Sequence, residues 1–139
     1  MHVLLGVIGI AALLAGALWL HASSNRRLVD RRFAGREPLS ANEFGHRLFN
    51  ATQAPIAAKL RGLLTEELGL DLARLRPEDE PIRHLRMDEF DSLAVVEFVI
   101  ATEKAFEVKL RDQDLVRIRT FGELVELVDR ELRADERTA

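Results

Sequence analysis

The sequence predicts an all-α fold, a small bundle of four helices with a long first loop, preceded by one transmembrane helix. Apolar side chains recur three or four residues apart in several separate stretches, as they do on the buried face of a helix. Alternation of the kind that marks a strand persists nowhere, and residues 3–20 contain no charged side chain. A chain of 139 residues has room for one small domain and an appendage.

The appendage is an apolar segment at the start of the chain. Residues 3–20 read VLLGVIGIAALLAGALWL, and at ~1.5 Å per residue this length crosses the hydrocarbon core of a bilayer. Trp19 stands at its end, and arginines follow. We therefore expect residues 1–21 to be a single-pass anchor in the inner (plasma) membrane, with the C-terminal domain in the cytoplasm. The alternative is a signal peptide, whose cleavage near Ala22 would leave a secreted helical protein.

The next segment, residues 22–53, reads as a basic juxtamembrane linker. Between 22 and 50 it carries six arginines against three acidic residues, and arginines near a bilayer are attracted to anionic headgroups. Ser40 and Glu43 fit a capping box that opens a short helix, either a spacer or a part of the domain. From 59 to 133 the balance is reversed, with 18 acidic against 13 basic residues, which argues against nucleic acid as a partner.

Residues 54–133 are expected to form the domain. Pro55 suits the first turn of a helix, and Gly69 suits its end. A loop from Leu70 to about Phe90 follows. The expected buried positions of the first helix are Ile56, Leu60, Leu63, Leu64 and Leu68, and the residues expected to pin the loop are Leu72, Leu75, Ile82 and Leu85.

Three further helices complete the predicted bundle. The second runs from about Ser92 to Phe106, a short third covers 112–116, and the last opens at a capping box formed by Thr120 and Glu123 and ends at about Leu132. Residues 134–139 are expected to be a disordered tail. The expected buried positions are Leu93, Val96, Val99, Ile100 and Phe106 on the second helix, and Phe121, Leu124, Val125, Val128 and Leu132 on the last.

The tripeptide Asp91-Ser92-Leu93 at the start of the second helix, together with this layout from 55 to 132, resembles an acyl carrier protein. The resemblance implies that Ser92 carries a covalent 4′-phosphopantetheine arm, with Asp91 and Leu93 completing the motif. It implies a phosphopantetheinyl transferase as one partner. Acyl-loading, synthase or acyltransferase enzymes of lipid or polyketide-like biosynthesis would be the others, docking on Glu97, Glu103 and Glu107. The protein would present thioester-bound acyl intermediates to them while tethered to the membrane.

Elementary chemistry agrees with this implication. The chain has no cysteine, so its own side chains provide no thiol, and a cofactor would have to supply the sulfur. A helix N-terminus favours an anionic phosphate. The four histidines are scattered without ligand spacing, so no metal is expected, and no catalytic set suggests an enzyme.

One departure from the family's pattern keeps an alternative open. The family usually has Leu-Gly-x before Asp-Ser, whereas this chain has Asp88, Glu89 and Phe90. The alternative is a carrier-like domain that is never loaded and acts as a membrane adaptor in protein interactions. Replacement of Ser92 by alanine separates the two, because only a carrier depends on the hydroxyl.

Overall fold

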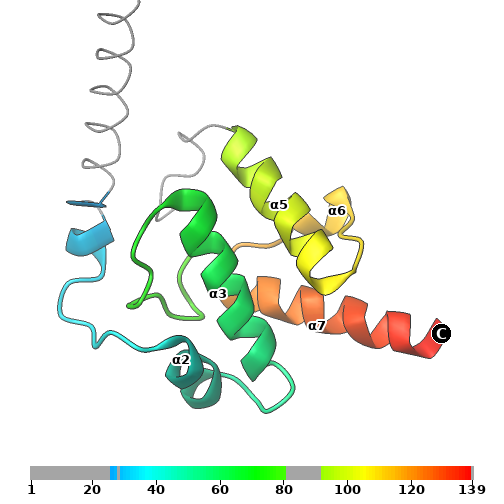
Figure 1. The fold of residues 1–139 in the computed structure, drawn as a ribbon, viewed down its shortest axis with the longest axis horizontal. Coiled ribbons are helices and arrows are strands. Elements are labelled where there is room, and N and C mark those ends of the chain that lie inside the picture. Colours follow the sequence, from blue (N-terminus) through cyan, green and yellow to red (C-terminus); the bar gives the residue numbers. More distant parts are fainter. Residues whose placement is uncertain (1–25, 28, 81–91, 139) are drawn as a thin grey trace, which may run out of the picture.

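The computed structural model describes residues 26–27, 29–80 and 92–138. Its helices are α2 (Ala41–Leu48), α3 (Ala54–Leu68), α5 (Ser92–Phe106), α6 (Asp112–Leu115) and α7 (Phe121–Thr138) (Figure 1). Residues 26–27 and 29–32 are also helical. Helices and loops are the only structure in these ranges, so the all-α prediction is confirmed. None of the described helices is long and apolar enough to cross a bilayer. The expected anchor, residues 3–20, lies outside the described ranges.

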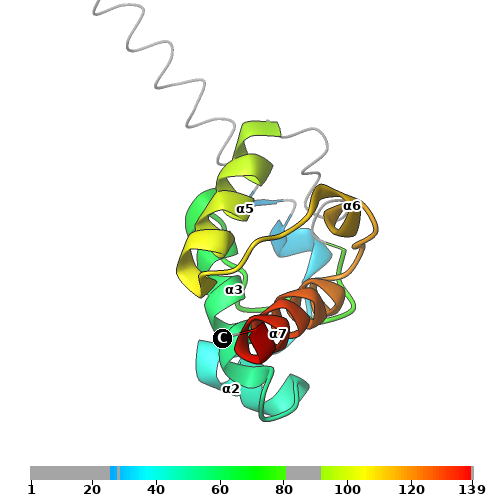
Figure 2. The same cartoon turned by 90° about the vertical axis from the view of Figure 1, so that its right-hand side faces the viewer.

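The helix α3 is the centre of the domain, and it contacts α2, α5 and α7 (Figures 1 and 2). Its first turn contains a proline, and it ends at Gly69, whose φ of 61° lies in the left-handed region that glycine adopts without strain. Both ends agree with the sequence prediction. Ile56, Leu60 and Leu64 are buried along its inner face, as expected.

Two capping boxes fix where α2 and α7 begin. The Glu43 N–H donates to Ser40 Oγ at 3.2 Å, and the Ser40 N–H donates to Glu43 Oε2 at 2.9 Å. At α7, the Glu123 N–H donates to Thr120 Oγ1 at 3.1 Å, and the Thr120 N–H donates to Glu123 Oε2 at 3.3 Å. Both predicted boxes are therefore confirmed, and each satisfies backbone donors that the helix itself leaves without partners.

An aromatic cluster joins α2 to α7. The rings of Phe44 and Phe121 meet edge to face, with centroids 5.6 Å apart, and Phe49 lies 5.4 Å from Phe44 and 6.5 Å from Phe121. These distances are in the range that aromatic pairs prefer. Because Phe44 and Phe121 are fully buried, this cluster is part of the core.

The described part of the first loop, residues 70–80, is pinned to the domain as predicted. Leu72 and Leu75 are buried, whereas Ile82 and Leu85 lie outside the described residues. The loop also closes the start of α7, because the Phe121 N–H donates to the Asp79 carbonyl at 2.9 Å and the Gly122 N–H donates to the Pro77 carbonyl at 2.8 Å.

Two expected boundaries are corrected. Residues 26–53 are not a linker beside the domain, because Val29, Phe33 and Leu39 are buried in its core. The expected disordered tail is helical as far as Thr138. Ala134, Glu136 and Arg137 are good helix formers, so nothing in the tail stops the helix at Leu132.

Candidate functional site

The candidate site is the N-terminal end of α5, whose first residue is Ser92. The helix spans Ser92–Phe106, as the sequence predicted. Of the other two motif residues, Asp91 lies outside the described residues, and Leu93 is 55% exposed. A phosphodiester on the first residue of a helix lies near the positive end of the helix dipole, where an anion is stabilised.

The buried face of α5 differs from the prediction. Leu93, Val96 and Ile100 were expected in the core, but they are 55%, 51% and 56% exposed. Phe98 and Thr102 are buried instead, and the Thr102 hydroxyl donates to the Phe98 carbonyl at 2.8 Å. Val99 and Phe106 are half-buried.

The physical reason is that α5 is apolar on more than one side. Positions 93, 96 and 100 have helical spacing, and so do positions 95, 98 and 102. Thr102 made the second set look less apolar, although its hydroxyl is satisfied within the helix. The outcome is an exposed apolar strip of Leu93, Val96 and Ile100, which begins beside Ser92.

An apolar cavity opens along the other side of α5. It holds about 280 Å³, against ~150 Å³ for an apolar cavity that binds benzene. Its walls come from α3, α5, α6, α7 and the segment before α7. The lining residues are Leu64, Val95, Phe98, Val99, Leu115, Val116, Ile118, Arg119, Thr120, Phe121 and Leu124. Val95 is about one helical turn from Ser92, so the cavity begins near the start of α5.

One wall of this cavity is held by the second capping box. Glu123 Oε2 accepts hydrogen bonds from the N–H groups of Arg119, at 2.7 Å, and Thr120, and these bonds lower the pKa of the Glu123 carboxyl. Arg119 and Thr120 both line the cavity. The cap therefore fixes the backbone at the cavity wall as well as the start of α7.

The end of α5 that is far from Ser92 is tied to its neighbours. Lys59 Nζ donates to the Ala105 carbonyl at 2.8 Å and lies 4.8 Å from the centre of the Phe106 ring. The Leu110 N–H donates to Glu103 Oε1 at 2.9 Å. These contacts place the start of α3 beside the end of α5, so the two helices run in opposite directions (Figure 1).

The three expected docking residues have different surroundings. Glu97 is exposed on α5. Glu103 is half-buried, and besides its bond to Leu110 its carboxylate lies 3.9 Å from Lys109 Nζ. Glu107 is exposed just beyond the helix, with a φ of 54°, a conformation in which glycine is more usual. Glu103 thus has a partner within the chain, and docking by the three residues stays a prediction.

Sequence reasoning missed Val116, which is 81% exposed although it also lines the cavity. The large apolar side chains that are exposed among the described residues therefore lie on α5 and on the segment after α6. Large apolar residues left in water next to a motif indicate a surface that contacts something else.

Comparison with known proteins gives the family of this chain. The family model "Phosphopantetheine attachment site" matches residues 58–128, just over half of the chain, and this stretch contains Ser92. A meromycolate extension acyl carrier protein of Mycolicibacterium smegmatis is 34% identical over 80 residues, covering 58% of this chain and 78% of the relative. The protein of the same name from Mycolicibacterium aurum is 32% identical over 80 residues, covering 58% and 79%. The chain therefore belongs to the acyl carrier proteins, which hold 4′-phosphopantetheine covalently and are not themselves catalytic.

Proposed function

We propose that this protein is a membrane-tethered acyl carrier that bears 4′-phosphopantetheine on Ser92. The observation that carries the proposal is the position of Ser92, which is the first residue of α5 and lies within the matched stretch 58–128. The arm thiol would hold acyl groups as thioesters and present them to synthase or acyltransferase enzymes. The similar proteins named for meromycolate extension support the extension of long acyl chains as the setting.

The apolar cavity supports an acyl cargo. An acyl chain in water exposes apolar surface, and its transfer into an apolar cavity is favourable by ~25 cal/mol per Å². The walls near the motif, Val95, Phe98 and Val99, are apolar, and Leu115 and Ile118 face them from the segment around α6. An acyl chain held near Ser92 is within one or two helical turns of this cavity. The domain can therefore shield the acyl chain from water between encounters with enzymes.

The exposed strip of Leu93, Val96 and Ile100 supports a role in docking. A partner enzyme that reaches the phosphopantetheine arm has to approach the start of α5, where this strip and the exposed Glu97 lie. Burial of the three apolar side chains would drive association, and the carboxylate would favour a basic patch on the partner.

Membrane tethering is proposed from residues 3–20, with the domain on the cytoplasmic side of the inner membrane. Tethering raises the effective concentration of the carrier near membrane enzymes without any new contact. The full chain in membranes from its host tests this part. Resistance to extraction at alkaline pH is the expected result, and complete release into the soluble fraction would contradict an anchor.

The intact mass of the full-length protein from its own host tests the site. We expect the phosphopantetheine increment on the natural protein and on Ser40→Ala, which alters the N-cap serine of α2, but not on Ser92→Ala. An increment that persists in Ser92→Ala would show that another residue carries the phosphopantetheine. An unmodified natural protein, even after coexpression with a broad-specificity transferase, would overturn the carrier proposal and leave the unloaded membrane adaptor.

A further inference from the structure

Residues 26–27 and 29–40, here called the N-terminal arm, are built into the domain. Val29, Phe33 and Leu39 are buried, and they belong to the same core as the helices α3 and α7. The buried guanidinium of Arg61 donates to the Leu39 carbonyl at 2.9 Å and lies 4.7 Å from the centre of the Phe44 ring. Burial lowers the pKa of Arg61, yet an arginine stays charged at neutral pH. The arm is therefore held by both apolar and polar contacts.

A second set of contacts fixes the middle of the arm to the first loop. Arg36 binds the buried carboxylate of Asp79 through both terminal nitrogens, at 2.6 and 3.0 Å, and this bond raises the pKa of Arg36. Arg74 Nε donates to the Arg36 carbonyl at 2.9 Å, and the Leu39 N–H donates to the Ala73 carbonyl at 2.8 Å. Because the arm is bound along its length, its first residues have a fixed position on the domain.

The outer face of the arm's first turns is basic. Arg27, Arg31 and Arg32 are exposed, and at 100° per residue they lie away from the buried side of Val29 and Phe33. Within the described residues no carboxylate forms an ion pair with any of the three. We call these three residues the arginine face.

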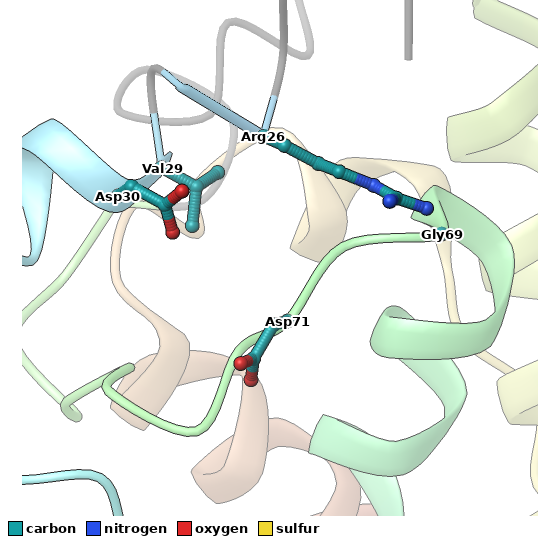
Figure 3. Close-up of a pocket in the computed structure, with 5 residues that line it drawn as sticks. All are labelled: Arg26, Val29, Asp30, Gly69 and Asp71. Atoms are coloured by element: carbon teal, nitrogen blue, oxygen red, sulfur yellow. The ribbon is translucent and has the colours of Figure 1, made fainter. Parts of the chain in front are cut away.

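The first turns of the arm lie at the same end of α3 as the start of α5. The arm meets the C-terminal end of α3, where Arg26, Val29 and Asp30 border a hollow of about 250 Å³ with Gly69 and Asp71. Figure 3 shows the Arg26 side chain extended toward Gly69. Since α3 and α5 run in opposite directions, the end of α3 is also the Ser92 end of α5 (Figures 1 and 2).

We propose that the arginine face binds anionic lipid headgroups and holds the Ser92 end of the carrier toward the bilayer. Two observations favour lipid as the partner. The arginines are complementary in charge to anionic headgroups, and the arm follows closely after the apolar residues 3–20, which end six residues before Arg26. Each arginine near an anionic surface contributes about fivefold to affinity, so three contribute on the order of 100-fold. The proposal rests on the proposed membrane location, but it does not depend on the loading of Ser92.

Arginine-specific chemical labelling of the full chain tests the contact. The protein is reconstituted in nanodiscs of phosphatidylcholine, with or without phosphatidylglycerol, and treated with phenylglyoxal before mass analysis. We expect labelling of Arg27, Arg31 and Arg32 to fall at least fivefold when phosphatidylglycerol is present, and to recover at 1 M salt, where charges are screened within ~3 Å. Arg130, exposed on α7, is the internal control and should not change. Equal labelling in both lipids would overturn the contact, as would equal protection of Arg130.

A second measurement tests the orientation. Because the chain has no cysteine, a loaded phosphopantetheine arm carries its single thiol, which takes a maleimide dye. We expect energy transfer from this dye to an acceptor at the anionic bilayer surface to fall in R27Q/R31Q/R32Q and to stay unchanged in the charge-matched control R117Q/R130Q/R137Q. Equal transfer in both variants would overturn the orientation. Failure of the dye to attach would count against loading of Ser92, and the labelling of the arginines would still test the lipid contact.

Discussion

The two long sides of α3 are covered in different ways. On one side, α2 and the N-terminal arm pack through fully buried rings such as Phe44 and Phe33, with the buried Arg61 bound between them. On the other side, α5 buries Phe98 and Thr102 but leaves Leu93, Val96 and Ile100 in water, with a cavity along its flank. The first side resembles a close-packed interior, and the second keeps apolar surface available.

This difference separates stability from function within one small domain. The arm, α2, α3 and α7 bury most of the apolar side chains and so provide most of the free energy of folding. The helix α5 contributes less of the core, and its exposed apolar side chains reduce the stabilisation it receives. The residues that we propose to contact cargo and partners therefore lie where the packing is least close.

The largest expected effect comes from truncating the ring at the centre of the packed side. Phe44→Ala removes a fully buried ring that contacts Phe49 and Phe121, and should lower the free energy of unfolding by about 3–5 kcal/mol. Leu93→Ala, on the exposed side, should change it by less than ~0.5 kcal/mol. Chemical denaturation of both variants measures the two values, and similar losses would show that the sides do not differ.

Two glycines, Gly45 and Gly62, test how closely α2 packs against α3, with a smaller expected effect. A Cβ at Gly45 in α2 would lie 2.5 Å from the Ala54 carbonyl oxygen, so Gly45→Ala should force α2 away from α3 and cost about 1–3 kcal/mol. At Gly62, within α3, a Cβ meets nothing within 4 Å.

Gly62→Ala is therefore the matched control and should stabilise the domain by about 0.5–1 kcal/mol through helix propensity. Thermal unfolding of the two alanine variants should shift in opposite directions. A Gly45→Ala variant as stable as the natural protein would mean that α2 is not closely packed against α3.

The smallest expected effect concerns the two capping boxes, at the starts of α2 and α7. Hydrogen bonds from backbone N–H groups lower the pKa of Glu43 and of Glu123. Each folded-state pKa lies below the unfolded value, so the stabilisation is present above about pH 4.3, where an unperturbed glutamate titrates, and is lost as the pH falls through the lowered pKa. The domain should therefore lose stability in acid.

The double variant E43Q/E123Q keeps a side chain that can cap but removes the titration. Its free energy of unfolding should fall less steeply below pH ~4.3 than that of the natural protein, as measured by urea denaturation at a series of pH values. Identical pH dependence would assign the loss in acid to other carboxylates.

Local signals predicted the elements well. Pro55 and Gly69 marked the ends of α3, and the two capping boxes marked the starts of α2 and α7. The arm was missed because its arginines dominate its composition. Val29 and Phe33 are four residues apart, and Leu39 and Phe44 occupy the two positions of a hydrophobic staple around the N-cap Ser40, so the signal was present.

The candidate site was predictable only in part. The motif located Ser92 at the start of a helix, which the structure reproduces. The exposed strip was assigned to the core, because an apolar helix satisfies helical spacing on two faces and only tertiary packing chooses between them. The cavity could not be read from the sequence, because its walls come from four helices that meet only after folding.

The bond from Lys59 Nζ to the Ala105 carbonyl has a mechanical consequence. It fixes α5 at one end, while Ser92 lies thirteen residues away, a distance of roughly 20 Å along the helix. When a rod pivots about a fixed end, its free end moves furthest. A tilt of α5 small enough to preserve the contacts of Thr102 would change the width of the cavity along Val95 and Val99 and would move Ser92 most of all. Ser92, the residue of α5 farthest from the fixed end, would therefore be displaced most by any change in the width of the cavity.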